Sequence, residues 1–262
     1  MGWRLFLLPV TLGAVALLCL ALFLRATRPS PQKQPVVVEL FTSEGCSSCP
    51  PADSLLKSLS ESQPIGGAEI IALEEHVDYW NSQGWKDPFS SANFTQHQQD
   101  YANLSLADTI YTPQMIIDGH AQIIGGRAQE VCDQIRAVAS RPKLRLLLTA
   151  TPAKKPHTFT LEVAPDPASP LPAASSLDVW IAVTEKGLQS NVTAGENSGE
   201  TLQHAPVVRQ LHKLPLVGPP LKFPLSFPLE LEEHWNQANL TAVVFLADPR
   251  TLQIQAAGSS PL

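Results

Sequence analysis

The chain has 262 residues, with 18 basic and 24 acidic side chains and a formal net charge of −6. Charges of both signs are mixed along the chain, so no basic patch marks a surface for nucleic acid. The length allows a sizeable hydrophobic core, and most of the 24 prolines lie beyond position 140, where they favour β-strands and turns. We therefore expect two domains, a β-rich second half and no nucleic-acid partner.

The segment from Leu5 to Leu24 carries no charge and is flanked by arginines. A helix of about twenty residues covers roughly 30 Å, the thickness of a bilayer core. The sequence that follows offers no convincing signal-cleavage site. We predict a membrane anchor or uncleaved signal at 1–28, a linker at 29–34, and the remainder on the extracytoplasmic side, periplasmic or at the cell surface. Cleavage would make the protein secreted.

The next segments predict a β-α-β unit. "VVVELF", at 36–41, is a β-branched run suited to a buried strand. "PADSLLKSLSES", at 51–62, places leucines on one face of a helix, and "AEIIALEEHVDYW", at 68–80, is interpreted as a second strand. Cys46 and Cys49 fall at the turn from the first strand to the helix.

A further helix is expected within 92–101. "YTPQMIIDG", at 111–119, predicts a strand that turns at its Asp-Gly pair into the hairpin partner "HAQIIGG". The apolar stripe of "RAQEVCDQIRAVAS", at 127–140, predicts a closing helix. These elements complete a first domain at 35–141.

From position 143 onward the pattern changes to seven short alternating runs separated by turn residues. Regularly spaced short strands of this kind are typical of a β-sandwich. We therefore predict an all-β, sandwich-like second domain at 143–258.

Cys46 and Cys49 form a C-x-x-C motif at a predicted helix N-terminus, where free N–H groups and the helix dipole stabilise a thiolate. Cys46 would be the exposed nucleophile and Cys49 the resolving thiol. An inert disulfide and half of a metal site are the alternatives. Zinc needs four ligands, and no second C-x-x-C or paired histidine cluster completes it, although the fold could recruit Cys132 and His76. We therefore assign no metal and no cofactor to the predicted site.

At this point the residues resemble the thioredoxin superfamily and, over longer motifs, the family labelled domain of unknown function twelve-twenty-three. The resemblance rests on "VELFTSEGCSSCPPAD", "HVDYWNSQGWKDPF", "YTPQMIIDG" and "GENSGETLQHAPVVRQL". It implies a secreted or membrane-attached bacterial protein, without an established reaction. The expected fold class is an α/β thioredoxin-like domain followed by an all-β sandwich-like domain, preceded by an N-terminal transmembrane helix.

The resemblance implies roles for individual residues. Cys46 and Cys49 match the active-site pair, and Pro113 matches the cis-proline that faces it. The backbone of Thr112 would then pair with a substrate chain. Glu39 is the candidate for the buried acid that relays protons, and a solvent-facing glutamate at the strand edge is the alternative.

The dipeptide between the two cysteines departs from the pattern that the resemblance implies. Ser47 and Ser48 supply no histidine or lysine to lower the pKa of Cys46, and Glu44 opposes the thiolate. We therefore expect a mild redox centre.

Two polar segments are further candidates. The segment "HVDYWNSQGWKDPF" would place a rim of polar and aromatic side chains beside the cysteines, and a packed aromatic loop is the alternative. The rim residues are His76, Asp78, Trp80 and Trp85. "GENSGETLQHAPVVR" is interpreted as a loop that contacts the first domain, with His204 and Glu196 as alternative ligand-binding residues.

The resulting hypothesis is a thiol–disulfide oxidoreductase or isomerase. It would act on the thiols and disulfides of exported proteins, together with a redox partner that the sequence does not name, and it would contact the membrane through residues 5–24. A non-catalytic binding or assembly module braced by a structural disulfide is one alternative. A protein that handles copper or another soft metal through its thiolates is the other.

Overall fold

The computed structural model describes residues 32–105, 109–169, 176–215 and 222–262. The predicted transmembrane segment at 5–24 lies outside these residues. Within the described part of the chain, no helix combines the length and apolar character needed to cross a membrane.

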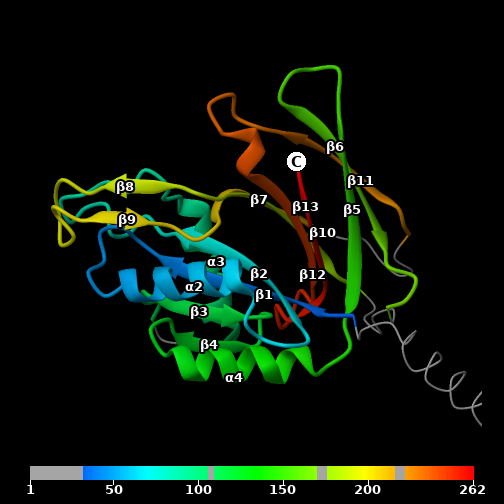
Figure 1. Cartoon of the computed structure of the whole chain (residues 1–262), viewed down its shortest axis with the longest axis horizontal. Helices are drawn as coiled ribbons and strands as arrows, with labels where there is room; N and C mark the ends of the chain where they lie inside the picture. The colour runs from blue at the N-terminus through cyan, green and yellow to red at the C-terminus, as the bar shows by residue number, and fades with distance from the viewer. Residues whose placement is uncertain (1–31, 106–108, 170–175, 216–221) are drawn as a thin grey trace, which may run out of the picture. The chain divides into compact units, whose positions relative to one another are not determined.

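The chain from β1 to β2 forms the predicted β-α-β unit. β1 (Gln34–Thr42) and β2 (Ala68–His76) pair in parallel, and α2 (Pro50–Ser62) connects them (Figure 1). α2 begins with two prolines, which are tolerated in the first turn because their missing N–H groups would have no partner there. It ends at Gln63, which adopts a left-handed conformation and donates its backbone N–H to the Leu59 carbonyl.

The next elements extend this unit on both faces. They are α3 (Ala92–Ser105), β3 (Gln114–Ile117), β4 (Ala121–Ile124) and α4 (Ala128–Ala139). β3 pairs antiparallel with β1, and the hairpin to β4 turns at the Asp-Gly pair, as predicted. Apolar side chains of α2 and α4 share one core with alternate β1 residues, whereas those of α3 pack on the opposite face. Two helical layers therefore enclose β1.

The second half is built almost entirely of strands. The long strands are β5 (Leu144–Pro152), β6 (Thr158–Pro165), β7 (Asp178–Glu185), β10 (Val207–Pro215), β11 (Leu225–Glu230), β12 (Leu240–Ala247) and β13 (Ile254–Pro261). A short 3-10 helix, η1 (Gln237–Asn239), precedes β12. β8 (Gln189–Asn191) and β9 (Thr201–Gln203) form a separate two-stranded hairpin, which we call the arm, residues 189–203. The arm projects beside α2 (Figure 1).

The predicted fold class is wrong. Instead of an α/β thioredoxin-like domain followed by a separate sandwich, the described strands of both halves join in one mixed sheet of eleven strands. Its order is β11-β6-β5-β13-β12-β7-β10-β2-β1-β3-β4. The sequence boundary at 141–143 falls between α4 and β5, and residues 33–262 form one compact unit.

The two halves join in one sheet because β2 would otherwise have an unpaired outer edge. A domain ending at residue 141 would leave that edge with unpaired backbone groups, which are costly when buried. β10 returns to this edge in parallel, with Val207 opposite Glu74 and the Glu74 N–H donated to the Pro206 carbonyl at 3.0 Å. The second core lies between β5, β6 and β11 on one side and β7 and β12 on the other, so a single sheet bends around it.

Candidate functional site

The two cysteines form a disulfide at the beginning of α2. The Cα atoms of Cys46 and Cys49 are 5.4 Å apart, and Cys49 is the N-cap residue of the helix. The Cys46 sulfur lies 3.3 Å from the Ser48 hydroxyl. Ser47 and Ser48 are exposed, but both cysteines have an exposed fraction of 0%. The helix N-terminus favours a thiolate at this position, whereas the surrounding chain keeps solvent and partners away from the sulfur atoms.

The arm supplies part of this cover. The Asn197 side-chain amide donates hydrogen bonds to the carbonyls of Glu44 and Cys46, at 2.8 and 3.1 Å. The Ser47 N–H donates to a Glu196 carboxylate oxygen at 3.0 Å. Hydrogen bonds from Ser47 hold the pKa of the Glu196 carboxyl below its usual value. The arm is therefore fastened directly to the backbone around the disulfide.

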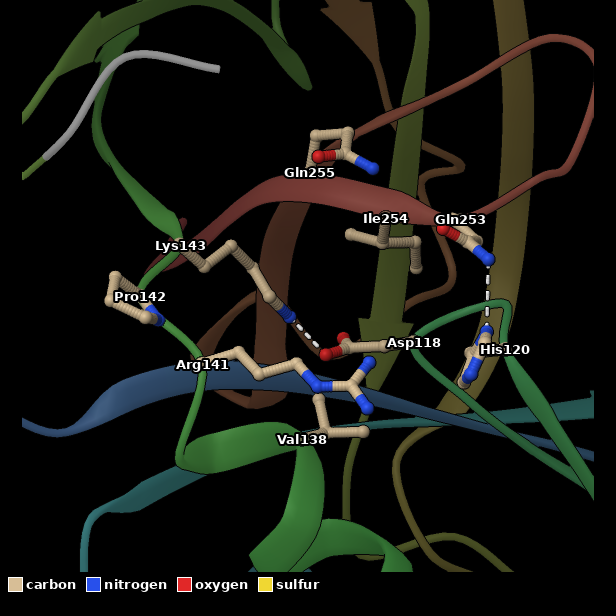
Figure 2. A pocket seen from close by; sticks show the side chains of 9 residues that line it. All are labelled: Asp118, His120, Val138, Arg141, Pro142, Lys143, Gln253, Ile254 and Gln255. Atoms are coloured by element: carbon tan, nitrogen blue, oxygen red, sulfur yellow. Dashed lines mark hydrogen bonds and ion pairs between the residues drawn. The ribbon is translucent and has the colours of Figure 1, made fainter. Parts of the chain in front are cut away.

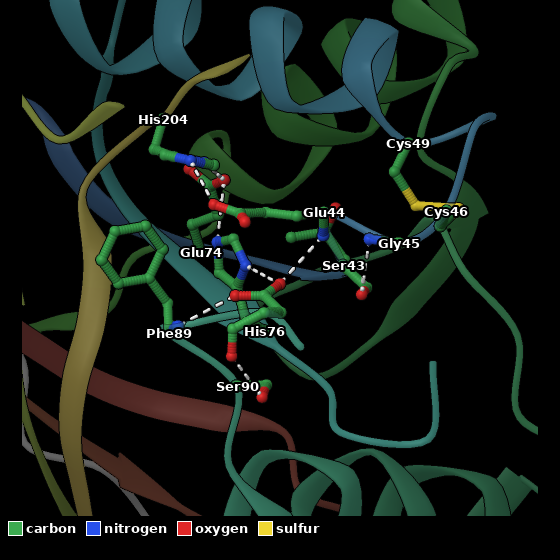
Figure 3. Close-up of polar contacts among 12 residues, drawn as sticks. Ser43, Glu44, Gly45, Cys46, Cys49, Glu74, His76, Phe89, Ser90 and His204 are labelled. Atoms are coloured by element: carbon green, nitrogen blue, oxygen red, sulfur yellow. Dashed lines mark hydrogen bonds and ion pairs between the residues drawn. A yellow bond between two sulfur atoms is a disulfide. The ribbon is translucent and has the colours of Figure 1, made fainter. Parts of the chain in front are cut away.

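A chain of buried acids and histidines begins at the same loop (Figure 3). Glu44 Oε1 lies 3.1 Å from His204 Nε2, and Nδ1 of the same histidine lies 3.0 Å from Glu74 Oε1. Glu74 Oε1 also lies 3.2 Å from His76 Nε2, and His76 Nδ1 lies 2.7 Å from Asp87 Oδ2. The five side chains are fully or almost fully buried. Each imidazole therefore lies between two carboxylates.

The electrostatics of this network follow from burial and close pairing. Burial, reinforced by the charge of Glu74, raises the pKa of the Asp53 carboxyl to about 8. The Thr42 hydroxyl donates a 2.7 Å hydrogen bond to this carboxyl. Burial alone would lower the pKa of His204, but its hydrogen bonds to two carboxylates raise it to about 9. The raised pKa values of Asp53 and His204 thus favour the protonated forms of both groups, close to the start of α2.

A second buried cluster lies on the opposite face of β1. His97 of α3 contacts Glu75 Oε2 at 3.0 Å and Glu39 Oε1 at 3.5 Å. The Tyr101 hydroxyl donates to Glu39 Oε2 at 2.6 Å. Burial raises the pKa of Glu39 to about 7, although the charge of His97 opposes this rise. The His97 ring also stacks on Trp180 with centroids 4.4 Å apart, so this cluster is part of the core between α3 and the sheet.

A cleft of about 510 Å³ runs between α2 and the arm. Its walls include Pro50, Asp53 and Lys57 of α2, together with Glu200 and Leu202 of the arm. Pro50 follows Cys49 directly, so one end of the cleft lies next to the disulfide. The cysteines themselves do not line the cleft, because both are fully buried.

A family model described as protein of unknown function (DUF1223) matches residues 37–247, which span both halves of the sheet. The chain belongs to this family. A search of curated proteins found no match for this DUF1223 chain. The family description brings no reaction with it, so the chemistry has to be argued from the site.

Two solved structures resemble the DUF1223 chain in fold. The crystal structure of protein AGR_C_4864 from Agrobacterium tumefaciens is 22% identical, with a TM-score of 0.61, and the match covers 88% of this chain and 95% of that one. HBP35 of Porphyromonas gingivalis is 15% identical, with a TM-score of 0.59, over 90% and 77% of the two chains. At these identities the likeness establishes the fold alone.

The two predicted rim tryptophans contact the cysteine loop. The Trp80 indole N–H donates to the Thr112 hydroxyl at 2.8 Å, and its Cβ lies 3.2 Å from the position that a Cβ on Gly45 would occupy. The Trp85 indole N–H donates to Glu44 Oε2 at 2.7 Å. The structure therefore places both side chains beside the loop, whereas their predicted role as a substrate-facing rim stays a prediction.

The predicted substrate-binding residues lie close to the first turn of α2. The bond between Thr112 and Pro113 is cis. A Cβ added to Gly125 would lie 2.7 Å from the Ala52 Cβ and 3.1 Å from the Pro113 Cβ, so helix and proline flank the same glycine. Pro113 is buried and Thr112 is half-buried.

Two predicted residues point elsewhere. Asp78 accepts a 2.6 Å hydrogen bond from the Thr95 hydroxyl of α3. Glu39 belongs to the second cluster, on the face of β1 that α3 covers, whereas α2 and its cysteines lie on the other face. The solvent-facing alternative for Glu39 is wrong, because its side chain is fully buried, and its role as a proton relay stays a prediction. Asp53 is a buried acid in the first turn of α2, and its backbone N–H donates to the Cys49 carbonyl at 3.2 Å.

Sequence reasoning missed most of the buried network. Glu74 was interpreted only as part of a strand, Asp53 as a helix residue, and Glu44 only as a charge opposing the thiolate. The available signal is the run Glu74-Glu75-His76, which directly follows the apolar segment "IIAL" of the same strand. Because carboxylates are rarely buried without partners, two adjacent glutamates followed by a histidine in a central strand indicate polar clusters on both of its faces.

A smaller cavity, of about 230 Å³, lies near the turn between β3 and β4 (Figure 2). Its wall holds the buried ion pair of Asp118 and Lys143. Asp118 Oδ1 also accepts from the Val37 N–H at 2.9 Å, and the Lys143 ammonium donates to the Pro35 carbonyl at 2.8 Å. These groups satisfy one another, so we assign the pair to stability rather than to chemistry.

Proposed function

We propose that this DUF1223 protein exchanges thiols and disulfides with exported proteins through Cys46 and Cys49. The observation that carries the proposal is the disulfide across the N-terminus of α2, next to one end of the cleft between α2 and the arm. Unpaired N–H groups at the helix start stabilise a Cys46 thiolate once the pair is reduced. We place the reaction outside the cytoplasm, because disulfides of this kind persist in oxidising compartments.

In the reducing direction, the Cys46 thiolate attacks one sulfur of a substrate disulfide. A bond forms between Cys46 and that sulfur, and the other substrate sulfur leaves as a thiolate that takes up a proton. The Cys49 thiol then loses its proton and attacks the Cys46 sulfur. This step closes the Cys46–Cys49 bond and releases the second substrate thiol. Two electrons pass from the protein dithiol to the substrate, and the reverse sequence oxidises a substrate dithiol.

Because both cysteines are buried, thiol–disulfide exchange requires the arm to open locally, away from the cysteine loop. Three hydrogen bonds join the arm to this loop: the Asn197 amide donates to the carbonyls of Glu44 and Cys46, and Glu196 accepts from the Ser47 N–H. Local opening of such elements is common at binding sites, because it costs less free energy than global unfolding.

The same burial favours a second candidate function. A disulfide with no exposed surface, fixed between α2 and the arm, could serve only to brace a binding or assembly module. Structural disulfides of this type have potentials below about −300 mV and resist exchange.

The deciding experiment uses Cys49→Ser, expressed in a host that exports the protein. Removing the resolving thiol should trap mixed disulfides between Cys46 and its partners. Non-reducing gels followed by mass spectrometry would detect them. The double variant Cys46→Ser and Cys49→Ser is the matched control, and Cys132→Ser, at the half-buried free cysteine, should leave the trapped species unchanged.

Two outcomes would exclude thiol exchange in favour of the structural disulfide. One is the absence of trapped species with Cys49→Ser. The other is a wild-type reduction potential below about −300 mV, measured against glutathione and dithiothreitol buffers.

A further inference from the structure

Three buried side chains, Glu74, His76 and His204, lie together close to the cysteine loop (Figure 3). Glu74 and His76 project from the same face of β2, two residues apart, and His204 follows the last residue of β9 (Figure 3). One ligand atom from each residue lies within 4.8 Å of the other two. The tertiary fold therefore brings together two imidazoles and one carboxylate from distant parts of the chain.

Each imidazole is oriented by a further carboxylate. His76 turns Nε2 toward Glu74 and Nδ1 toward Asp87, and His204 turns Nδ1 toward Glu74 and Nε2 toward Glu44. In metal sites, a ligating histidine almost always donates its other ring N–H to an outer carboxylate or carbonyl, which fixes the ring and raises its basicity. Both histidines of this cluster have that arrangement.

The outer carboxylates are themselves held in place. Asp87 accepts hydrogen bonds from the backbone N–H groups of Glu44 and Phe89, at 2.8 and 2.9 Å. The second oxygen of Glu44 accepts the Trp85 indole N–H. Three chain segments thus hold the outer shell rigidly around the two imidazoles.

One ligand atom is left without a partner. Among the described residues, Glu74 Oε2 is buried and accepts no hydrogen bond, while Oε1 of the same carboxylate faces both histidines. A buried carboxylate oxygen without a partner is costly. A cation between the two imidazoles and Glu74 that is bound by both carboxylate oxygens would give Oε2 a partner and remove that cost.

We propose that Glu74, His76 and His204 bind a divalent transition-metal ion of the zinc class. Two imidazoles and a carboxylate suit Zn²⁺ or Fe²⁺, whereas Mg²⁺ and Ca²⁺ prefer oxygen ligands and Cu⁺ prefers sulfur. Three protein ligands leave one coordination position open. The site uses neither cysteine, so it is independent of the proposed thiol exchange.

The test measures zinc bound by the purified full-length chain after treatment with a chelator and reloading with Zn²⁺ alone. Elemental analysis should give one zinc ion per wild-type chain. Competition with a chromophoric chelator should show that Glu74→Gln and His204→Gln each weaken binding by about 100-fold or more. Asp87→Asn, which removes an outer carboxylate, should weaken it by about 10- to 100-fold. His97→Gln, in the second buried cluster, is the matched control and should keep the wild-type affinity.

Cobalt provides a readout that does not depend on the folding of any variant. Co²⁺ bound to the wild type should give visible ligand-field bands without the near-ultraviolet charge-transfer band that thiolate ligands produce. A wild type without stoichiometric zinc would overturn the proposal. So would full zinc affinity in folded Glu74→Gln, loss of zinc in folded His97→Gln, or a thiolate band that disappears with Cys46→Ser.

Discussion

Glu39 shows how a single buried carboxyl can respond to pH. It lies in the central strand β1 and contacts His97 and Tyr101 of α3. The charges of Glu75 and Asp118 also act on it. Burial favours its neutral form and raises its pKa from 4.5 to about 7. The folded state therefore holds the Glu39 proton more tightly than the unfolded chain does.

Glu39→Gln should consequently change the pH dependence of stability. Between pH 4.5 and pH 7 the folded wild type keeps a proton that the unfolded chain has lost, so its free energy of unfolding falls as the pH rises. Relative to Glu39→Gln, we expect the wild type to lose about 2 to 3 kcal/mol between pH 5 and pH 8. Urea denaturation at both pH values measures this difference.

The exposed Glu61→Gln, on α2, is the control and should show no such change. A stability difference between wild type and Glu39→Gln that stays constant from pH 5 to pH 8 would contradict the prediction.

At the scale of elements, the arm is the feature that decides access to the disulfide. β8 and β9 pair only with each other, outside the large sheet, and the loop between them reaches the backbone at Cys46. Few backbone pairs hold such an element in place, so it can open locally while the sheet stays folded.

Asn197→Ala should accelerate reduction of the disulfide by dithiothreitol. The substitution removes two hydrogen bonds, each worth about 1 kcal/mol, so the open population of the arm should rise about 30-fold. Stopped-flow or quench assays of free thiols follow the rate under conditions in which the protein stays folded.

Asn191→Ala serves as the control, because it removes an exposed hydrogen bond to Thr201 within the arm and no contact with the cysteine loop. Equal acceleration by both variants, or none by Asn197→Ala, would refute arm-controlled access.

At the scale of the whole molecule, the buried ion pair of Asp118 and Lys143 helps to join the two halves. Asp118, in the turn after β3, binds Lys143, which directly precedes β5, and accepts the Ile254 N–H through its carbonyl at 3.0 Å. Lys143 also donates to the Pro35 carbonyl at the start of β1. Strands from the beginning, middle and end of the chain therefore meet at a single charged contact.

Lys143→Met should lower the free energy of unfolding by about 3 kcal/mol, because Asp118 would keep a buried charge without its partner. Chemical denaturation monitored by tryptophan fluorescence and circular dichroism measures the loss. Lys155→Met removes an ion pair whose side chains are both 66% exposed, and it should change stability by less than about 1 kcal/mol. A similarly small effect for Lys143→Met would show that the ion pair of Asp118 and Lys143 contributes little to the free energy of unfolding.

The local elements could be predicted from the sequence because their signals are local. The Pro50-Pro51 start, the apolar stripe of α4 and the Asp118-Gly119 turn each depend on residues a few positions apart. The fold class could not be predicted in this way. The pairing of β10 with β2 depends on a strand more than a hundred residues away, and no pattern within β2 specifies which strand covers its edge.

The candidate site could likewise be predicted from the sequence only in part. The amino-acid sequence by itself determined the C-x-x-C spacing, its place at the start of a helix and membership of the DUF1223 family. Only the tertiary structure decided that the arm buries the disulfide, and that His204 completes a cluster with Glu74 and His76. The physical reason is that capping, turns and helix dipoles act between neighbours in sequence, whereas burial and ligand geometry depend on segments that only the folded sheet brings together.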